Sequence, residues 1–358
     1  MTKYEGECRL SMSSSRNISV DIARGIAIIA VVCGHVGISM INRVVFTFHL
    51  PIFWLITGYF TKEGETLPLV IKKRFRTLLV PYYITCTVVM IASCIFRIVN
   101  GQPELIVERL KYWGLATLYA AGDPYTEPFV INSIGAIWFL WASFWGNIFL
   151  NLVLKMKPLC RAFAVAVLFA MGYYTRAICW LPLSIQAGCC SVFFMYMGYL
   201  VKEVRPVYEK SSDELRISLF MISVGAWVNF MMQFQSFWLV HSDIGRGILD
   251  VIGSLCACYV LMVICKEIEK RLSLFGRGLA YLGRYSIIVL LMHYIEVSFF
   301  QWNILNNLML DQGYGRVPRF IIRMSLKFLW IIGTTVILSR INPIRKLFGM
   351  KVGQKDIK

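Results

Sequence analysis

The sequence predicts an all-α membrane protein, a polytopic bundle of about ten transmembrane helices with both termini in the cytoplasm. Hydrophobic residues make up 58% of the 358 residues, charged residues make up 16%, and the mean hydropathy is +0.63. Soluble domains carry about 25% charged residues. Apolar runs close to 20 residues long, the length that crosses a bilayer, recur along the chain. Lys and Arg residues gather in the links between these runs.

The apolar runs define the predicted elements in chain order. The predicted spans are residues 18–39, 44–60, 79–99, 132–154, 161–181, 184–201, 215–234, 245–265, 279–300 and 319–339. They form a transmembrane domain over residues 18–340, with cytoplasmic tails at 1–17 and 341–358. The polar start of the chain indicates no cleavable signal peptide. We find no repeat and expect no appended soluble domain.

The distribution of basic residues predicts the orientation. An even number of spans puts both termini on one side of the membrane. Alternate links, counted from the N-terminal tail, carry about three times as many Lys and Arg residues as the remaining links, and such basic links stay in the cytoplasm. The same distribution accounts for the net charge of +17 without nucleic acid as a partner. The partner that it indicates is the lipid bilayer of the cell membrane.

The cysteines and the known short motifs argue against metal chemistry. Most of the 11 cysteines lie inside apolar runs, with no CxxC pair and no spacing typical of metal ligands. We therefore interpret them as small buried apolar residues and expect no metal. The chain has no nucleophile elbow and no phosphate-binding glycine loop.

Three polar residues in the first span are the first candidates for chemistry. Asp21, Arg24 and His35 lie in an apolar run, where a charged residue costs about 2.5 to 3.5 kcal/mol or more. Eleven helical steps of about 100° return to within roughly 20° of the start, so Arg24 and His35 share one face, and Asp21 joins them. Neutral imidazole, with a pKa near 6.5, suits His35 to act as a general base. A histidine satisfied by helix neighbours, and an Arg24–Asp21 pair, are the structural alternatives.

Four motifs resemble, in order, those of the acyltransferase-3 family of integral membrane acyltransferases. They are Arg24 with His35 followed by FTFHLPIFWLITGY, the basic KKRFRTLLVPY at 72–82, IWFL at 137–140 and GRYSIIVLLMH at 283–293. The resemblance covers nearly the whole chain. It implies O-acylation, the transfer of an acyl group, commonly acetyl, to a hydroxyl of an envelope polysaccharide or lipid-linked glycan.

The donor implied by this resemblance is an acyl-CoA such as acetyl-CoA. Arg24 and His35 are separated by about 16 Å along a helix, comparable to an extended pantetheine arm. Lys73, Arg74 and Arg76 stand before the third span, where guanidinium and ammonium groups suit phosphate binding. Membrane topology alone is the other explanation for this basic cluster.

Four further residues are candidates for substrate binding. They are His49, Trp138, Ser286 and His293, for which helix packing is the structural alternative. The link at 100–131 is expected outside, either as one wall of the acceptor site or as an interfacial helix. A transporter or flippase for an envelope precursor is the second functional interpretation. The sequence leaves open the acceptor, the acyl group, an acyl-enzyme intermediate and the oligomeric state.

Overall fold

The computed structural model describes residues 17–126, 129–271 and 273–348, and its regular secondary structure within these ranges is helical, apart from an isolated bridge between Tyr125 and Ile131. The predicted all-α class is confirmed. The first half contains α1 (Ile18–Gly34), α2 (Ser39–Val45), α3 (Pro51–Tyr59), α4 (Leu67–Arg74), η1 (Phe75–Leu79), α5 (Val80–Val99), η2 (Pro103–Leu105), α6 (Ile106–Tyr119), η3 (Gly135–Ile137), α7 (Trp138–Leu154) and α8 (Pro158–Thr175). The second half contains η4 (Pro182–Ser184), α9 (Ile185–Glu209), α10 (Asp213–Met232), η5 (Leu239–His241), α11 (Ile248–Lys270), α12 (Leu274–Arg284), α13 (Ser286–Phe299), α14 (Trp302–Asp311), α15 (Arg316–Arg340) and α16 (Asn342–Leu347).

Seven helical segments of the described chain are long and apolar enough to cross a membrane, or eight if the bent α12–α13 pair counts as one span. They are Leu67–Val99, Gly135–Leu154, Pro158–Thr175, Pro182–Glu209, Asp213–Met232, Ile248–Lys270 and Arg316–Arg340. The prediction of ten spans is not confirmed, because the first two predicted spans form short helices. The first ends at Gly34 after 17 residues, and the second is divided between α2 and α3.

The predicted tails lie largely outside the described residues. Within the predicted C-terminal tail, however, α16 packs against α15. The side of the membrane on which either terminus lies stays a prediction.

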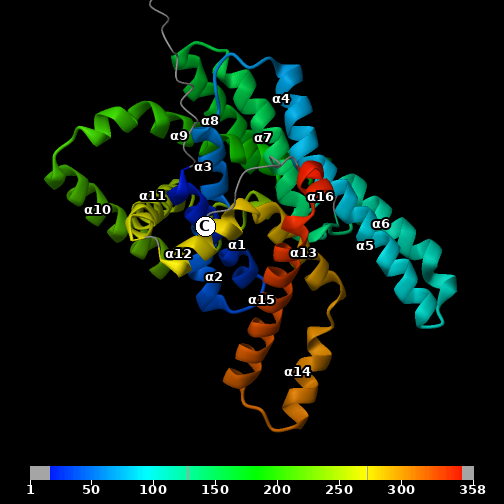
Figure 1. The fold of residues 1–358 in the computed structure, drawn as a ribbon. Coiled ribbons are helices and arrows are strands. Elements are labelled where there is room, and N and C mark those ends of the chain that lie inside the picture. Colours follow the sequence, from blue (N-terminus) through cyan, green and yellow to red (C-terminus); the bar gives the residue numbers. More distant parts are fainter. Residues whose placement is uncertain (1–16, 127–128, 272, 349–358) are drawn as a thin grey trace, which may run out of the picture.

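Helices α1, α3, α12 and α13 occupy the middle of the molecule (Figure 1). Two pairs of glycines let backbones approach closely there, as small residues do at helix crossings in membranes. A Cβ atom at Gly25 of α1 would lie 2.0 Å from a carbonyl oxygen of α12, and one at Gly283 would lie 1.8 Å from a carbonyl oxygen of α1. Gly58 and Gly198 join α3 to α9 in the same way. These crossings fix the helices that carry the candidate site.

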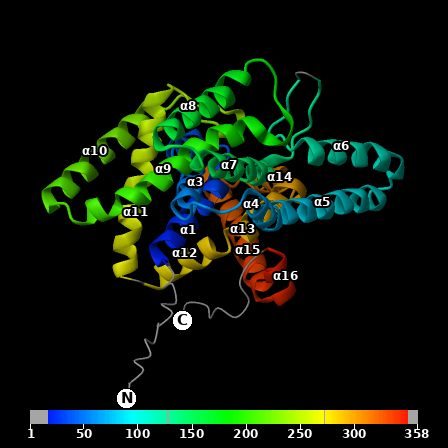
Figure 2. The same cartoon turned by 90° about the horizontal axis from the view of Figure 1, so that it is seen from above.

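Other helices extend outward from this centre. The α5–α6 hairpin, the α14–α15 pair and α10 point in three different directions (Figures 1 and 2). Helix α10 buries little besides Phe230 and exposes large apolar side chains such as Ile217, Met221 and Ile222. Apolar helices that face outward are expected where lipid replaces water.

The predicted outer link at 100–131 forms helix α6, which lies beside α5 (Figure 2). The Tyr82 hydroxyl of α5 donates to the Thr117 carbonyl of α6 at 2.8 Å. The helix ends at Ala120, whose φ of +56° reverses the chain toward the centre of the bundle. Whether α6 lies at the membrane surface stays a prediction.

Candidate active site

A cavity of about 590 Å³ opens between α1, α3, α7 and the bent α12–α13 pair. Its volume falls within the range of small-molecule sites. The structure brings six of the ten predicted site residues to its wall. They are Arg24, His35, His49, Arg74, Trp138 and Ser286.

His35 caps the C-terminal end of α1 and faces this cavity. Its Nδ1 lies 2.8 Å from the Val31 carbonyl oxygen. A carbonyl oxygen only accepts, so this contact assigns the ring proton to Nδ1 in the neutral imidazole and leaves the lone pair on Nε2. The side chain is therefore oriented as a base by its own helix.

His49 repeats this arrangement in the turn that precedes α3. Its Nδ1 lies 2.8 Å from the Val45 carbonyl oxygen, and the ring packs beside Phe46 with ring centroids 5.0 Å apart. The same argument places the lone pair on Nε2. The cavity therefore holds two histidines in the same tautomer, of which His49 is buried and His35 is exposed.

Three guanidinium groups also line the cavity. Arg24 and Arg74 were predicted, whereas Arg284, the last residue of α12, was not. Arg24 precedes His35 by eleven residues on one helix, a separation of about 16 Å along the axis. The cavity wall is thus basic near Arg24 and carries a neutral base farther along α1.

The other predicted basic and acidic residues lie away from the cavity wall. Lys73 is exposed and pairs with Glu65 at 3.4 Å. Arg76 lines a separate cavity beside α16, with Lys346. Asp21 is buried in α1, where its backbone meets α12.

Trp138 and Ser286 line the cavity, and each is the first residue of a helix. Trp138 is the first residue of α7 and is buried. Ser286 is the first residue of α13, which turns away from α12 by 78°. Gly283, Arg284 and Ser286 all line the cavity, so its wall includes the bend itself.

The predicted His293 lies behind His35 instead of on the wall. The two rings meet edge to face with centroids 5.1 Å apart, and His293 is fully buried. Its Nδ1 lies 3.1 Å from a carboxylate oxygen of Glu296, one turn farther along α13. Its Nε2 is buried with no hydrogen-bond partner in the described residues.

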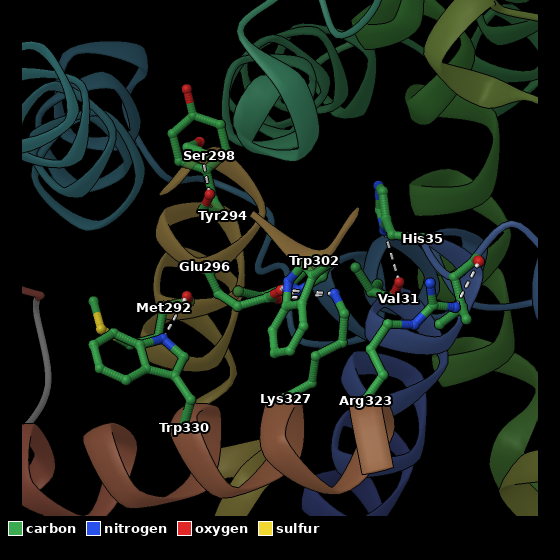
Figure 3. Close-up of polar contacts among 12 residues, drawn as sticks. Val31, His35, Met292, Tyr294, Glu296, Ser298, Trp302, Arg323, Lys327 and Trp330 are labelled. Atoms are coloured by element: carbon green, nitrogen blue, oxygen red, sulfur yellow. Dashed lines mark hydrogen bonds and ion pairs between the residues drawn. The ribbon is translucent and has the colours of Figure 1, made fainter. Parts of the chain in front are cut away.

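Glu296 is the centre of a buried polar network that joins α13, α14 and α15. Its oxygens lie 2.8 and 3.0 Å from the Lys327 ammonium and also accept from the Trp302 indole. Figure 3 shows these three side chains pointing toward one another, with His35 on the neighbouring helix. Lys327 and Trp302 were not predicted. Lys327 could have been singled out from the sequence, because a lysine inside an apolar span usually has a function. Its partner could not, because that depends on how α15 packs.

Comparison with known proteins agrees with these motifs. A family model described as an acyltransferase domain, that of the acyltransferase-3 family, matches residues 17–340. The nodulation protein NolL of Mesorhizobium japonicum is 25% identical over 189 residues, which cover 47% of this chain and 45% of that protein. The match therefore spans less than half of that relative. No solved structure gives a significant match. Because the family model covers nearly the whole chain, this protein belongs to the acyltransferase-3 family.

Proposed function

We propose that this protein is a membrane O-acyltransferase, which moves an acetyl group from cytoplasmic acetyl-CoA to a hydroxyl of an envelope glycan in the cell membrane. The observation that carries the proposal is one cavity lined by Arg24, Arg74 and Arg284 and also by His35. Arginine forks suit the phosphates of coenzyme A. The lone pair on His35 Nε2 suits the proton of an alcohol.

The reaction follows from these two features. The acceptor hydroxyl gives its proton to His35 Nε2 as its oxygen attacks the thioester carbonyl carbon. The carbon–sulfur bond then breaks, an ester forms, and the protonated His35 gives its Nε2 proton to the departing sulfur, which leaves as coenzyme A thiol. A positioned general base typically contributes about 10²- to 10⁴-fold to the rate.

Transport of an envelope precursor is the second candidate function. Buried charges such as Glu296 and Lys327 are also what transporters use for protons and substrates. The two candidates differ in whether a covalent bond is made.

Purified protein in lipid nanodiscs, given acetyl-CoA labelled in the acetyl group, tests the proposal directly. The acceptor is envelope polysaccharide stripped of its esters by mild alkali. We expect label in the polysaccharide that alkali releases again, with matching release of coenzyme A. A deletion strain should lose the same ester from its envelope. Unaltered ester content and no transferred label would reject the acyltransferase and leave transport.

A further inference from the structure

Two links of the chain meet over the cavity and contact each other through polar groups. His241 Nε2 lies 2.8 Å from an Asp123 carboxylate oxygen, and His241 Nδ1 lies 2.8 Å from the Tyr125 hydroxyl. Asp123 and Tyr125 follow α6, whereas His241 lies between α10 and α11. We call Asp123, Tyr125, Trp238 and His241 the aromatic mouth.

Contacts with neighbouring residues hold the aromatic mouth in place. The Tyr125 ring stacks on Trp180, with centroids 4.8 Å apart and planes 7° apart. Five residues after His241 in the same link, Arg246 donates twice to the buried Asp250 carboxylate at 2.8 and 2.7 Å. Ser242 is fully buried with a φ of +54°, a conformation that persists only where the surroundings impose it. These contacts therefore fix the conformation of the link.

Trp238 is exposed on this rigid link. Its exposed fraction is 48%, whereas its neighbours Phe237 and Leu239 are 1% and 2% exposed. Its ring stacks on the His241 ring, with centroids 6.0 Å apart. Trp238 therefore presents a half-exposed ring, held by its stacking on His241, on the wall of the cavity.

The charge and shape of the aromatic mouth restrict that ligand. Asp123 and Trp238 both line the cavity that holds His35. A carboxylate repels anions and accepts hydrogen bonds from hydroxyl groups. An indole presents a flat apolar face with which the C–H face of a sugar ring makes contact. A neutral or cationic glycosyl unit satisfies both groups, whereas a lipid phosphate would be repelled by Asp123.

We infer that the aromatic mouth binds a glycosyl unit of the acceptor, with Trp238 as the stacking platform and Asp123 as the acceptor of hydroxyl hydrogen bonds. His241 holds Asp123 from one side and supports the Trp238 ring from the other. A sugar bound there occupies the same cavity as His35 Nε2. That this sugar is then acylated rests on the proposed function. That it binds does not.

The test compares Trp238→Ala, Trp238→Phe and Asp123→Asn in the nanodisc assay, with alkali-treated envelope polysaccharide as the probe. We expect Trp238→Ala to raise KM for the polysaccharide about tenfold and Asp123→Asn several-fold, with KM for acetyl-CoA unchanged. Trp238→Phe should stay near the parent. Phe129→Ala is the matched control, because Phe129 is exposed in one of the same links and does not line the cavity.

Binding is measured separately from transfer by quenching of tryptophan fluorescence as polysaccharide is titrated onto the His35→Gln protein. We expect a saturable signal whose midpoint shifts to several-fold higher polysaccharide concentration in Asp123→Asn, which keeps every tryptophan, and stays in place in Phe129→Ala. In Trp238→Ala the quenching should be weaker at every concentration. Saturable binding without label transfer by the parent protein would reject the proposed reaction and keep the glycosyl site. An unchanged polysaccharide KM and unchanged quenching in Trp238→Ala would reject the glycosyl site, whatever the transfer activity.

Discussion

At the scale of single residues, the decisive feature is the hydrogen bond from His35 Nδ1 to the Val31 carbonyl. It places the basic nitrogen at Nε2 and does so within one helix. His35→Gln keeps a polar side chain and removes the base, so we expect transfer to fall by about 10²- to 10⁴-fold. Binding of coenzyme A, measured by calorimetry, should persist. His49→Gln, in the same cavity, is the comparison: if it loses more activity than His35→Gln, the base is His49.

Lys73 and Arg74 are adjacent in the sequence, but we expect only Arg74 to contribute to the binding of the acyl donor. Arg74 lines the cavity, whereas Lys73 pairs with Glu65 on the surface. Arg74→Ala should weaken coenzyme A binding by about 1.5 to 3 kcal/mol, the value of a hydrogen bond to a charged group. Lys73→Ala is the matched control and should change it little. Equal losses in both variants would indicate a general effect of charge. Arg76, beside a separate cavity, should resemble the control.

The sequence predicts which residues share a face of one helix, but not which residues of different helices meet. Arg24 and His35 were placed together because helix periodicity relates positions within one helix. Arg284 was missed because its place on the wall depends on the close crossing of α1 and α12. The pairing of Glu296 with Lys327 was missed because it joins helices whose contact no periodicity specifies.

At the scale of helices, the Glu296–Lys327 pair ties α13 to α15 behind His293. Both side chains are buried. Removing one partner of a buried ion pair costs about 3 to 5 kcal/mol, whereas replacing both with neutral groups is often tolerated. We expect Lys327→Met to lower the midpoint of thermal unfolding in detergent. The double variant Glu296→Gln with Lys327→Met should recover most of it. A double variant no more stable than the single one would contradict a stabilising role for the pair.

The crossing of α1 and α12 sets where Arg24, Arg284 and the start of α13 meet. A Cβ atom at Gly283 would lie 1.8 Å from a backbone oxygen of α1, and backbone has nowhere to move. Gly283→Ala should therefore separate the helices and abolish transfer. Gly278→Ala lies on the same helix with nothing within 4 Å and is the matched control. It should keep its activity and gain up to about 1 kcal/mol in helix stability. Similar activities in both variants would show that the crossing is dispensable.

Sequence reasoning found the helices whose length alone identifies them. Seven predicted spans coincide with long apolar helices, because hydropathy over about 20 residues reflects the bilayer thickness. The bend at Tyr285, between α12 and α13, is different. Tyr285 is buried where the two helices meet at 78°, between Gly283 and Ser286. A Gly/Ser pair permits a sharp kink, but hydropathy over the whole run does not report it. Ser286 lines the cavity directly after that bend.

At the scale of the whole molecule, the links contact one another in two separate groups. In one group, Arg161 pairs with Glu63 at 2.6 Å, and Arg205 donates to the Tyr59 hydroxyl at 2.6 Å. All four lie in or next to links predicted to be cytoplasmic. In the other group, His241 of one predicted outer link meets Asp123 of another. This segregation agrees with the alternation that the charge pattern predicts, but it does not assign a side to either group.

Labelling of single cysteines in intact cells assigns that side. Lys111, Lys73 and Arg205 are all exposed, so a cysteine at each should react whenever the reagent reaches it. Cys160 is the exposed native cysteine among the described residues and is replaced by serine in the background. We expect a membrane-impermeant maleimide to label position 111 in intact cells, and positions 73 and 205 only after permeabilisation. The basic clusters would then face the cytoplasmic supply of acetyl-CoA, as the positive-inside rule requires. Labelling at 73 and 205 in intact cells would put Arg74 on the outer side and overturn the cytoplasmic donor.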